Sequence, residues 1–267
     1  MPTRVTDPGP VGVPRLWIGT SWKMNKGLAE ARRYVRGLSD HVSRHGAPGV
    51  QPFIIPSFTA LAAARDELGT DSTVLLGAQN AHWEDEGAWT GEVSVAQAKD
   101  AGAQLVEIGH SERREHFGET VETTRLKVAA VLAHGLVPLL CIGESAEVKR
   151  AGNSSPFILD QAAGALDGLT APELSRVLIA YEPIWAIGES GRPATVEELR
   201  QPFADLDREY GGRTRGLVYG GSVNHDNAGD LLGIDGVTGL FIGRAAWQLP
   251  GYLSLLEIAA AHPKAAG

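Results

Sequence analysis

The sequence has little of what several classes of protein require. Cys141 is the one cysteine among 267 residues, so no disulfide can form within the chain, which is usual in the reducing cytoplasm. No apolar run approaches the roughly 20 residues that span a bilayer, and the first fourteen residues carry no apolar segment of a signal peptide. The 24 Lys and Arg residues are outnumbered by 32 Asp and Glu residues, without any basic run. We therefore expect a cytoplasmic protein that binds neither membrane nor nucleic acid.

Motifs for cofactors and metals are also missing. The dinucleotide-binding pattern GxGxxG does not follow the first apolar strand. His41 and His45 lie four residues apart, but no Glu follows the first His as in the zinc-binding pattern HExxH. We expect no cofactor and no metal ion. An acidic chain of this kind binds an anionic small molecule through local donors and one or two placed cations.

What the sequence does contain is an eightfold alternation of apolar runs and helical patterns. The runs are nearly continuous in apolar residues, as in strands buried on both faces of a parallel sheet. Residues 1–14 are rich in Pro and Gly and are predicted to be a flexible extension; 15–262 form one domain, and 263–267 a C-terminal tail. A TIM (β/α)₈ barrel fits best, and an open doubly wound sheet is the alternative. The predicted strands are 15–22, 51–57, 73–80, 105–110, 136–143, 176–184, 216–222 and 239–244.

The segment after the sixth predicted strand illustrates the pattern that predicts the helices. Apolar residues recur there at spacings of three and four, which predicts an amphipathic helix. Thr195 and Glu198 have the spacing of a capping box that opens it. Pro202 interrupts the pattern and predicts a kink or a later start.

Polar residues follow three of the predicted strands. In a parallel barrel the carboxyl ends of the strands form the active site. Lys23 follows the first predicted strand, the fourth ends at His110, and the sixth carries Glu182 near its end. Isomerising a hydroxycarbonyl compound needs a carboxylate to take a proton from carbon, a donor to polarise the carbonyl and a cation to stabilise the oxyanion. Each residue alone has an ordinary structural explanation, but their convergence favours catalysis by Glu182, His110 and Lys23.

Glycines after the last strands predict a phosphate site. Gly220, Gly221 and Ser222 form the end of the seventh predicted strand, and Gly243 lies at the end of the eighth. Flexible backbone at these places supplies the N–H donors that phosphate needs. The polar stretch 186–195 has the composition of a lid that excludes water from a reactive intermediate.

The motifs resemble those of triosephosphate isomerase from about residue 15 to 258. They are SWKMN (21–25), GAQN (77–80), TGEVS (90–94), IGHSERREHFGE (108–119), CIGE (141–144), YEPIWAIG (181–188) and YGGSV (219–223). The resemblance implies that Glu182 shuttles the proton and that His110 is a neutral electrophile whose pKa is lowered by a helix N-terminus. Lys23 would contact the substrate, and Glu112 would support Lys23.

The resemblance has further implications for the lid and for assembly. Gly188, Ser222 and Gly243 match the family's phosphate site. Trp185 matches the lid hinge, which in the family contacts the equivalent of Glu144. The family is commonly dimeric, with the loop over residues 78–92 reaching into the partner, so we expect a homodimer.

Three departures from the family pattern concern the substrate. Ser21 stands where the family has Asn, the lid IGESGRPAT is one residue longer, and Arg244 replaces a glycine beside the phosphate site. The variant motifs GTSWKMNK, GAWTGE and FIGRAAW are similar to a branch that isomerises L-erythrulose 1-phosphate. The substrate is therefore either a triose phosphate or this four-carbon ketose phosphate. A catalytically silent barrel that binds a phosphorylated metabolite is the alternative, although such a protein should have lost the base or the electrophile.

Overall fold

Eight parallel strands close into a barrel in the computed structural model, which describes residues 15–188 and 191–266. The predicted extension 1–14, lid residues 189–190 and residue 267 lie outside the described residues. Each strand pairs with the next in the chain, and β8 returns to β1, so the predicted TIM barrel is confirmed. The strands are β1 (Leu16–Ser21), β2 (Val50–Ile55), β3 (Leu75–Ala78), β4 (Leu105–Ile108), β5 (Val137–Ile142), β6 (Leu178–Tyr181), β7 (Gly216–Tyr219) and β8 (Gly239–Ile242).

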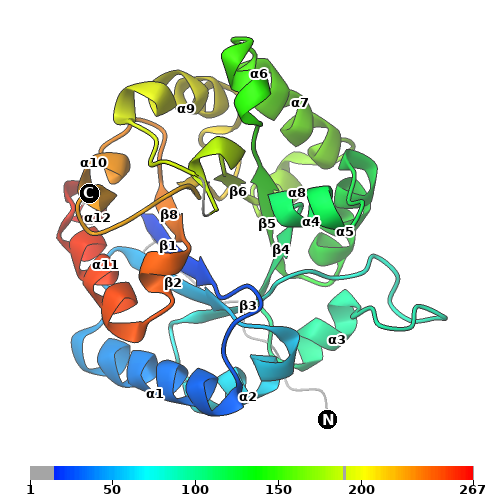
Figure 1. Cartoon of the computed structure of the whole chain (residues 1–267). Helices are drawn as coiled ribbons and strands as arrows, with labels where there is room; N and C mark the ends of the chain where they lie inside the picture. The colour runs from blue at the N-terminus through cyan, green and yellow to red at the C-terminus, as the bar shows by residue number, and fades with distance from the viewer. Residues whose placement is uncertain (1–14, 189–190, 267) are drawn as a thin grey trace.

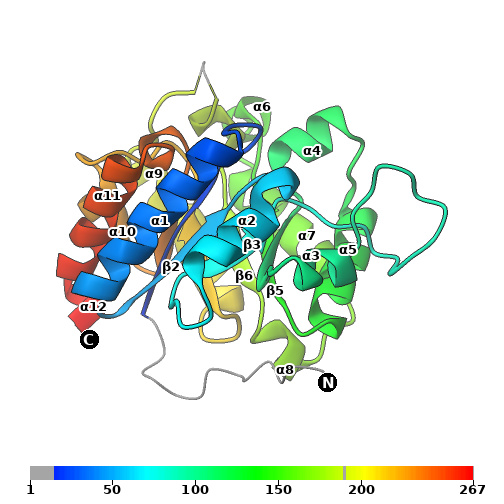
Figure 2. The same cartoon turned by 90° about the horizontal axis from the view of Figure 1, so that it is seen from below.

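Helices surround the barrel as an outer ring (Figure 1). In Figure 2 the short helices α4 and α6, which follow β4 and β5, lie above the barrel, so the carboxyl ends of the strands face upward. The helices are α1 (Leu28–His45), α2 (Phe58–Leu68), α3 (Val95–Asp100), α4 (Ser111–His116), α5 (Val121–Ala133), α6 (Ala146–Arg150), α7 (Ser154–Leu166), α8 (Ala171–Leu174), η1 (Ile184–Ala186), α9 (Val196–Tyr210), α10 (Ala228–Leu232), η2 (Arg244–Ala246), α11 (Leu249–Ala261) and α12 (Pro263–Ala266).

The barrel has two apolar cores because successive side chains of a strand point to opposite faces. On β4, Val106 and Ile108 belong to the large core between the strands and the helices. Leu105 belongs to a smaller core inside the barrel, together with Trp17 and Phe53. The same alternation directs the side chain of Glu107 into the barrel interior, at its carboxyl end.

Two details of the helices differ from the sequence expectation. Helix α9 begins at Val196 behind its Thr195–Glu198 capping box, and Pro202 lies inside it rather than before its start. Burial of the apolar face that includes Pro202 and Phe203 offsets the one hydrogen bond that Pro cannot donate. The predicted tail forms the short helix α12, in which Lys264 Nζ donates to two backbone carbonyl groups at 2.7 and 2.9 Å.

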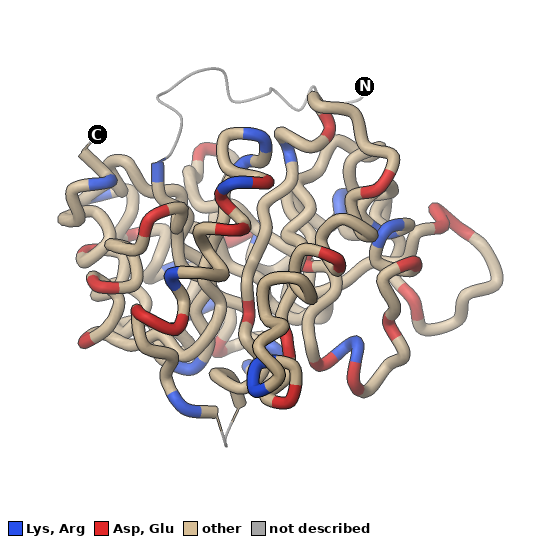
Figure 3. Tube along the Cα trace, turned by 90° about the horizontal axis from the view of Figure 1, so that it is seen from above, with Lys and Arg blue, Asp and Glu red and all other residues tan. Residues whose placement is uncertain are grey.

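The surface of the described part of the chain carries interleaved acidic and basic segments (Figure 3). No helix there is long and apolar enough to cross a membrane. The loop between β3 and α3 projects beyond the ring of helices in Figures 1 and 2. Large apolar side chains stay exposed on this loop and near the barrel mouth: Trp89 is 49%, Phe117 68% and Met24 96% exposed.

Candidate active site

The three residues predicted to be catalytic meet at the carboxyl end of the barrel. Lys23 follows β1, His110 follows β4 and Glu182 follows β6. His110 Nε2 lies 3.7 Å from Glu182 Oε2, and Lys23 Nζ lies 2.6 Å from Glu112 Oε1. Both His110 and Glu182 are buried. The arrangement places a buried imidazole and a buried carboxyl group beside a partly exposed ammonium group.

His110 is held as a neutral imidazole with a defined tautomer. Its Nδ1 accepts a hydrogen bond from the backbone N–H of Glu112 at 3.2 Å, in the first turn of α4. Nε2 therefore carries the ring proton and can donate it. Burial is the largest cause that lowers the pKa of His110 to about 4, and the charge of Lys23 is the next. Burial and the charge of Lys23 thus favour the neutral ring, as does the N–H group at the start of α4, where the resemblance implied a helix N-terminus.

Glu182 has the properties of a base that works near neutral pH. Burial raises its pKa to about 8, and repulsion by the Glu107 carboxylate contributes. Gly220, predicted as part of the phosphate site, lies directly against this side chain. A Cβ atom at Gly220 would lie 2.5 Å from Glu182 Cγ. Position 220 therefore needs glycine because a larger residue would overlap the side chain of Glu182.

Lys23 is positioned by a strained backbone. Its φ of 52° lies in the left-handed region, which is unfavourable for a residue with a side chain. Two amide side chains hold this turn: Gln79 Nε2 donates to the carbonyl of Lys23 at 2.8 Å, and Asn25 Nδ2 to that of Trp22 at 2.7 Å. The strained backbone is therefore held by Gln79, directly after β3, and by Asn25 in the turn itself, with the ammonium group directed at Glu112.

The residues predicted to bind phosphate lie on loops that hydrogen-bond to one another. Ser222, after β7, donates its backbone N–H to the carbonyl of Ala186 at 3.0 Å. Arg244, after β8, donates from Nη2 to the carbonyl of Gly188 at 3.0 Å. Gly243 precedes Arg244 and opens η2. Gly221, also predicted to bind phosphate, has a packing reason to be glycine: a Cβ atom there would lie 2.1 Å from the hydroxyl of Tyr219.

The expected hinge contact of Trp185 is confirmed. Its Nε1 donates to Glu144 Oε1 at 2.8 Å, and the hydroxyls of Tyr181 and Ser154 donate to the same atom at 3.1 Å. The ammonium group of Lys149 lies 3.3 Å from the centroid of the indole ring, a cation–π contact. The base of the lid is thereby anchored to the end of β5.

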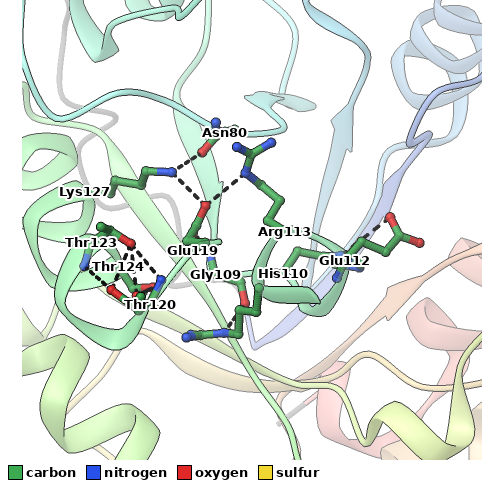
Figure 4. A network of polar contacts seen from close by, with 11 residues as sticks. Asn80, Gly109, His110, Glu112, Arg113, Glu119, Thr120, Thr123, Thr124 and Lys127 are labelled. Carbon is green, nitrogen blue, oxygen red and sulfur yellow. Dashed lines mark hydrogen bonds and ion pairs between the residues drawn. The ribbon is translucent and has the colours of Figure 1, made fainter. Parts of the chain in front are cut away.

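Sequence reasoning did not find Glu119 as the centre of a buried network (Figure 4). Its carboxylate accepts from the backbone N–H of Gly109 at 2.8 Å, from Arg113 Nε at 2.9 Å and from Lys127 Nζ at 2.7 Å. Lys127 also donates to Asn80 Oδ1 at 2.8 Å. Arg113 and its partner Glu119 lie six residues apart in the chain. The network fixes the turn that carries His110.

Sequence reasoning also passed over Glu107. It is 3% exposed, and burial raises its pKa to about 7. The available signal was its position as the one charged residue within the apolar run LVEIGH. Its Oε2 has no hydrogen-bond partner among the described residues.

The fold and these groups define an acid–base enzyme whose site lies at the carboxyl end of a (β/α)₈ barrel. The sequence profile of triosephosphate isomerase matches residues 16–259. The chain therefore belongs to the triosephosphate isomerase family, and it is an isomerase.

Its relatives place it near one branch of that family. The chain is 80% identical to an L-erythrulose-1-phosphate isomerase of Mycolicibacterium smegmatis, over 96% of this chain and 97% of that protein. It is 48% identical to an L-erythrulose-1-phosphate isomerase of Rhizobium rhizogenes, over 93% and 96% of the two chains. The triosephosphate isomerase structure from Bartonella henselae superimposes with a TM-score of 0.81 at 34% identity, covering 92% of this chain and 99% of that one.

Proposed function

We propose that this chain isomerises L-erythrulose 1-phosphate to D-erythrulose 4-phosphate. The observation that carries the proposal is the 80% identity, over 96% of the chain, to a protein named for this substrate. Relatives at 44–49% identity carry the same name. Ser21 supports the proposal, because the four-carbon ketose has a CH₂OH group where dihydroxyacetone phosphate has hydrogen, and a small side chain leaves room for it.

In the proposed mechanism Glu182 moves one proton between the two central carbons. Its carboxylate removes the proton from C3 of the ketose phosphate, and an enediolate forms. Nε2–H of His110 donates to the oxygens that become negative, and the Lys23 ammonium group stabilises their charge. The proton then returns from Glu182 to C2, so the carbonyl group has moved to C3. Glu112, through its 2.6 Å contact, holds Lys23 in place.

We assign the phosphate group to the loops after the last three strands. Gly243 and Gly188 offer backbone N–H groups there. Ser222, whose own N–H is bonded to the Ala186 carbonyl, offers its hydroxyl group from the same turn as Gly221. Arg244 adds a cation close to them, and its bond to the Gly188 carbonyl couples the cation to the base of the lid. Closure of the lid over the phosphate would exclude water from the enediolate.

Steady-state kinetics with two substrates test the proposal. Purified protein should show a higher kcat/KM with L-erythrulose 1-phosphate than with dihydroxyacetone phosphate. One extra CH₂OH group in a pocket changes specificity by about 10- to 200-fold, so measurable activity on the triose is compatible with the proposal. A kcat/KM that is higher with the triose phosphate would refute the four-carbon assignment and leave the isomerase class intact.

We also propose that the enzyme is a cytoplasmic homodimer. The projecting β3–α3 loop supports this, because Trp89 is half exposed at 49% and stacks only on its own loop, with its ring 4.4 Å from that of His82. Met24, beside the catalytic Lys23, is 96% exposed and offers an apolar contact for such a loop. Sedimentation equilibrium should give twice the mass of 28.3 kDa.

A further inference from the structure

Three buried oxygen atoms inside the barrel lack a hydrogen-bond partner among the described residues. They are Ser21 Oγ, Glu107 Oε2 and Glu182 Oε2. A buried polar atom without a partner destabilises the folded protein, so these three at the carboxyl end of the barrel need an explanation. Glu182 is explained as the base. The mechanism uses neither the Ser21 hydroxyl nor the Glu107 carboxyl group.

The strand pattern directs these three side chains into the barrel interior. Ser21 shares the inward face of β1 with Trp17, and Glu107 shares that of β4 with Leu105. Glu182 continues the inward face of β6. Burial raises the pKa of Glu182, and the charge of Glu107 adds to this effect. Burial also raises the pKa of Glu107, whereas the charge of Lys23 lowers it. Glu107 therefore lies within electrostatic reach of both Glu182 and Lys23.

Of these groups, Glu107 lies on the side of the barrel away from the phosphate loops. Those loops follow β6, β7 and β8, and β4 is the strand opposite β8 in the closed order. Ser21 ends β1, which pairs with β8, and its side chain faces the same interior. A ketose phosphate bound with its phosphate at β7 and β8, and with its central carbons at Glu182 and His110, directs its other end toward β4. For the four-carbon substrate this end is a CH₂OH group.

We propose that Glu107, with Ser21, binds the terminal hydroxymethyl group and thereby sets the preference for the four-carbon substrate over a triose phosphate. The proposal rests on the proposed function. A hydroxyl group can donate one hydrogen bond to the Glu107 carboxylate and accept one from the Ser21 hydroxyl, which satisfies both groups. A triose phosphate has hydrogen at this position and leaves both unsatisfied. Sites that hydrogen-bond a substrate hydroxyl discriminate strongly against an analogue that lacks it.

The alternative is that Glu107 has a purely structural role. Glu119, also buried at the end of the barrel, shows how this protein stabilises a structural carboxylate, with three donors from the protein itself. Glu107 lacks such a set at Oε2. A structural role would predict equal effects of a Glu107 substitution on all substrates, whereas a substrate contact predicts an effect on one.

The experiment compares kcat/KM for L-erythrulose 1-phosphate and dihydroxyacetone phosphate in three variants. Glu107→Leu should lower the value for the four-carbon substrate by about 10- to 100-fold, the usual effect of losing one hydrogen bond to a charged group. At a pH above the pKa of Glu182, where its coupling to Glu107 no longer affects the ionised fraction, the value for the triose should change by less than about threefold. Glu107→Gln keeps an acceptor and the shape of the side chain, so it should retain part of the preference. Glu119→Gln is the matched control, which should change thermal stability but leave the ratio of the two values unchanged.

The outcomes separate this inference from the proposed function. If the wild-type protein prefers the triose, the four-carbon assignment fails, and this inference with it. If the wild-type protein prefers the four-carbon substrate and both Glu107 variants keep its ratio, only the inference is overturned. Equal losses on both substrates would also overturn it, in favour of a structural role. Should Glu107→Leu not fold, the ratio measured with Glu107→Gln decides.

Discussion

Two buried carboxyl groups at the carboxyl end of this barrel have opposite environments. Glu119 accepts hydrogen bonds from Gly109, Arg113 and Lys127, and the positive charges of Lys127 and Arg113 outweigh burial and lower its pKa. Glu107 is equally buried, but burial dominates there and raises its pKa to about 7. Burial alone therefore does not mark a functional carboxylate. What distinguishes the two is whether the protein itself supplies the hydrogen-bond donors.

The difference has a consequence for stability. The network around Glu119 holds the turn of His110 rigid, because each of its members is satisfied within the protein. In contrast, Oε2 of Glu107 and Oε2 of Glu182 have no hydrogen-bond partner among the described residues, which lowers the stability of the free enzyme. Such a cost is typical of sites whose polar groups are completed by a ligand. The first region should therefore respond to substitution mainly in stability, and the second mainly in activity.

The largest expected effect is on the chemical step. Glu182→Gln should lower kcat by about 10³- to 10⁴-fold, because the amide cannot accept the proton from carbon. The variant should still bind a phosphoglycolate-like inhibitor, since the phosphate loops are unchanged. Stopped activity assays and inhibitor titration by calorimetry measure the two quantities. A variant that keeps near-normal kcat would show that another group is the base.

The next largest effect is a loss of stability in the network around Glu119. Lys127→Met removes an ammonium group whose side chain is 6% exposed and leaves the Glu119 carboxylate, 2% exposed, with one cation fewer. Removing one partner of a buried ion pair costs about 3–5 kcal/mol of unfolding free energy. Urea unfolding followed by circular dichroism measures the loss. An unchanged midpoint would mean that Arg113 and Gly109 suffice to satisfy Glu119.

The corresponding substitution at Glu107 should have the opposite effect on the unfolding free energy. Glu107→Leu removes a buried carboxyl group and should leave the unfolding free energy unchanged or raise it. In the wild-type protein the pKa of Glu107 rises from 4.5 to about 7 on folding, so the folded state holds more protons between these values. The contribution of Glu107 to the unfolding free energy therefore decreases as the pH rises from 4.5 to about 7. Unfolding curves at pH 5 and pH 8 should differ less for Glu107→Leu than for the wild-type protein.

The pH dependence of catalysis gives a smaller and more specific effect. Catalysis needs ionised Glu182, whose pKa is raised to about 8, so kcat/KM should rise with pH up to about that value. His110, with its pKa lowered to about 4, stays neutral throughout this range. Glu107→Gln removes one of the negative charges that raise the pKa of Glu182, while Lys23, Glu112 and Cys141 remain. Its rising limb should shift to lower pH; a shift to higher pH would contradict the coupling.

The fold and the three catalytic candidates could be predicted from the sequence for a physical reason. Buried parallel strands are continuous apolar runs, and the first polar residue after each run lies at the barrel mouth, as Lys23, His110 and Glu182 do. Glu107 and Glu119 could not be recognised in this way. The role of each depends on partners brought together by the closed barrel, and a spacing within the chain does not reveal whether a buried carboxylate will find a donor.

The smallest expected effect concerns Arg244, which the sequence placed beside the phosphate site. The structure shows its guanidinium bonded to the carbonyl of Gly188 at 3.0 Å, while the side chain is otherwise exposed. Exposed charged contacts of this kind contribute about 0.2–1 kcal/mol, so Arg244→Ala should raise KM for the ketose phosphate by about two- to fivefold, with little change in kcat. Arg244→Lys keeps the charge but cannot reproduce the planar guanidinium contact. If the lysine variant restores KM, Arg244 acts through its charge on the phosphate; if it behaves like alanine, Arg244 acts by holding Gly188 at the base of the lid.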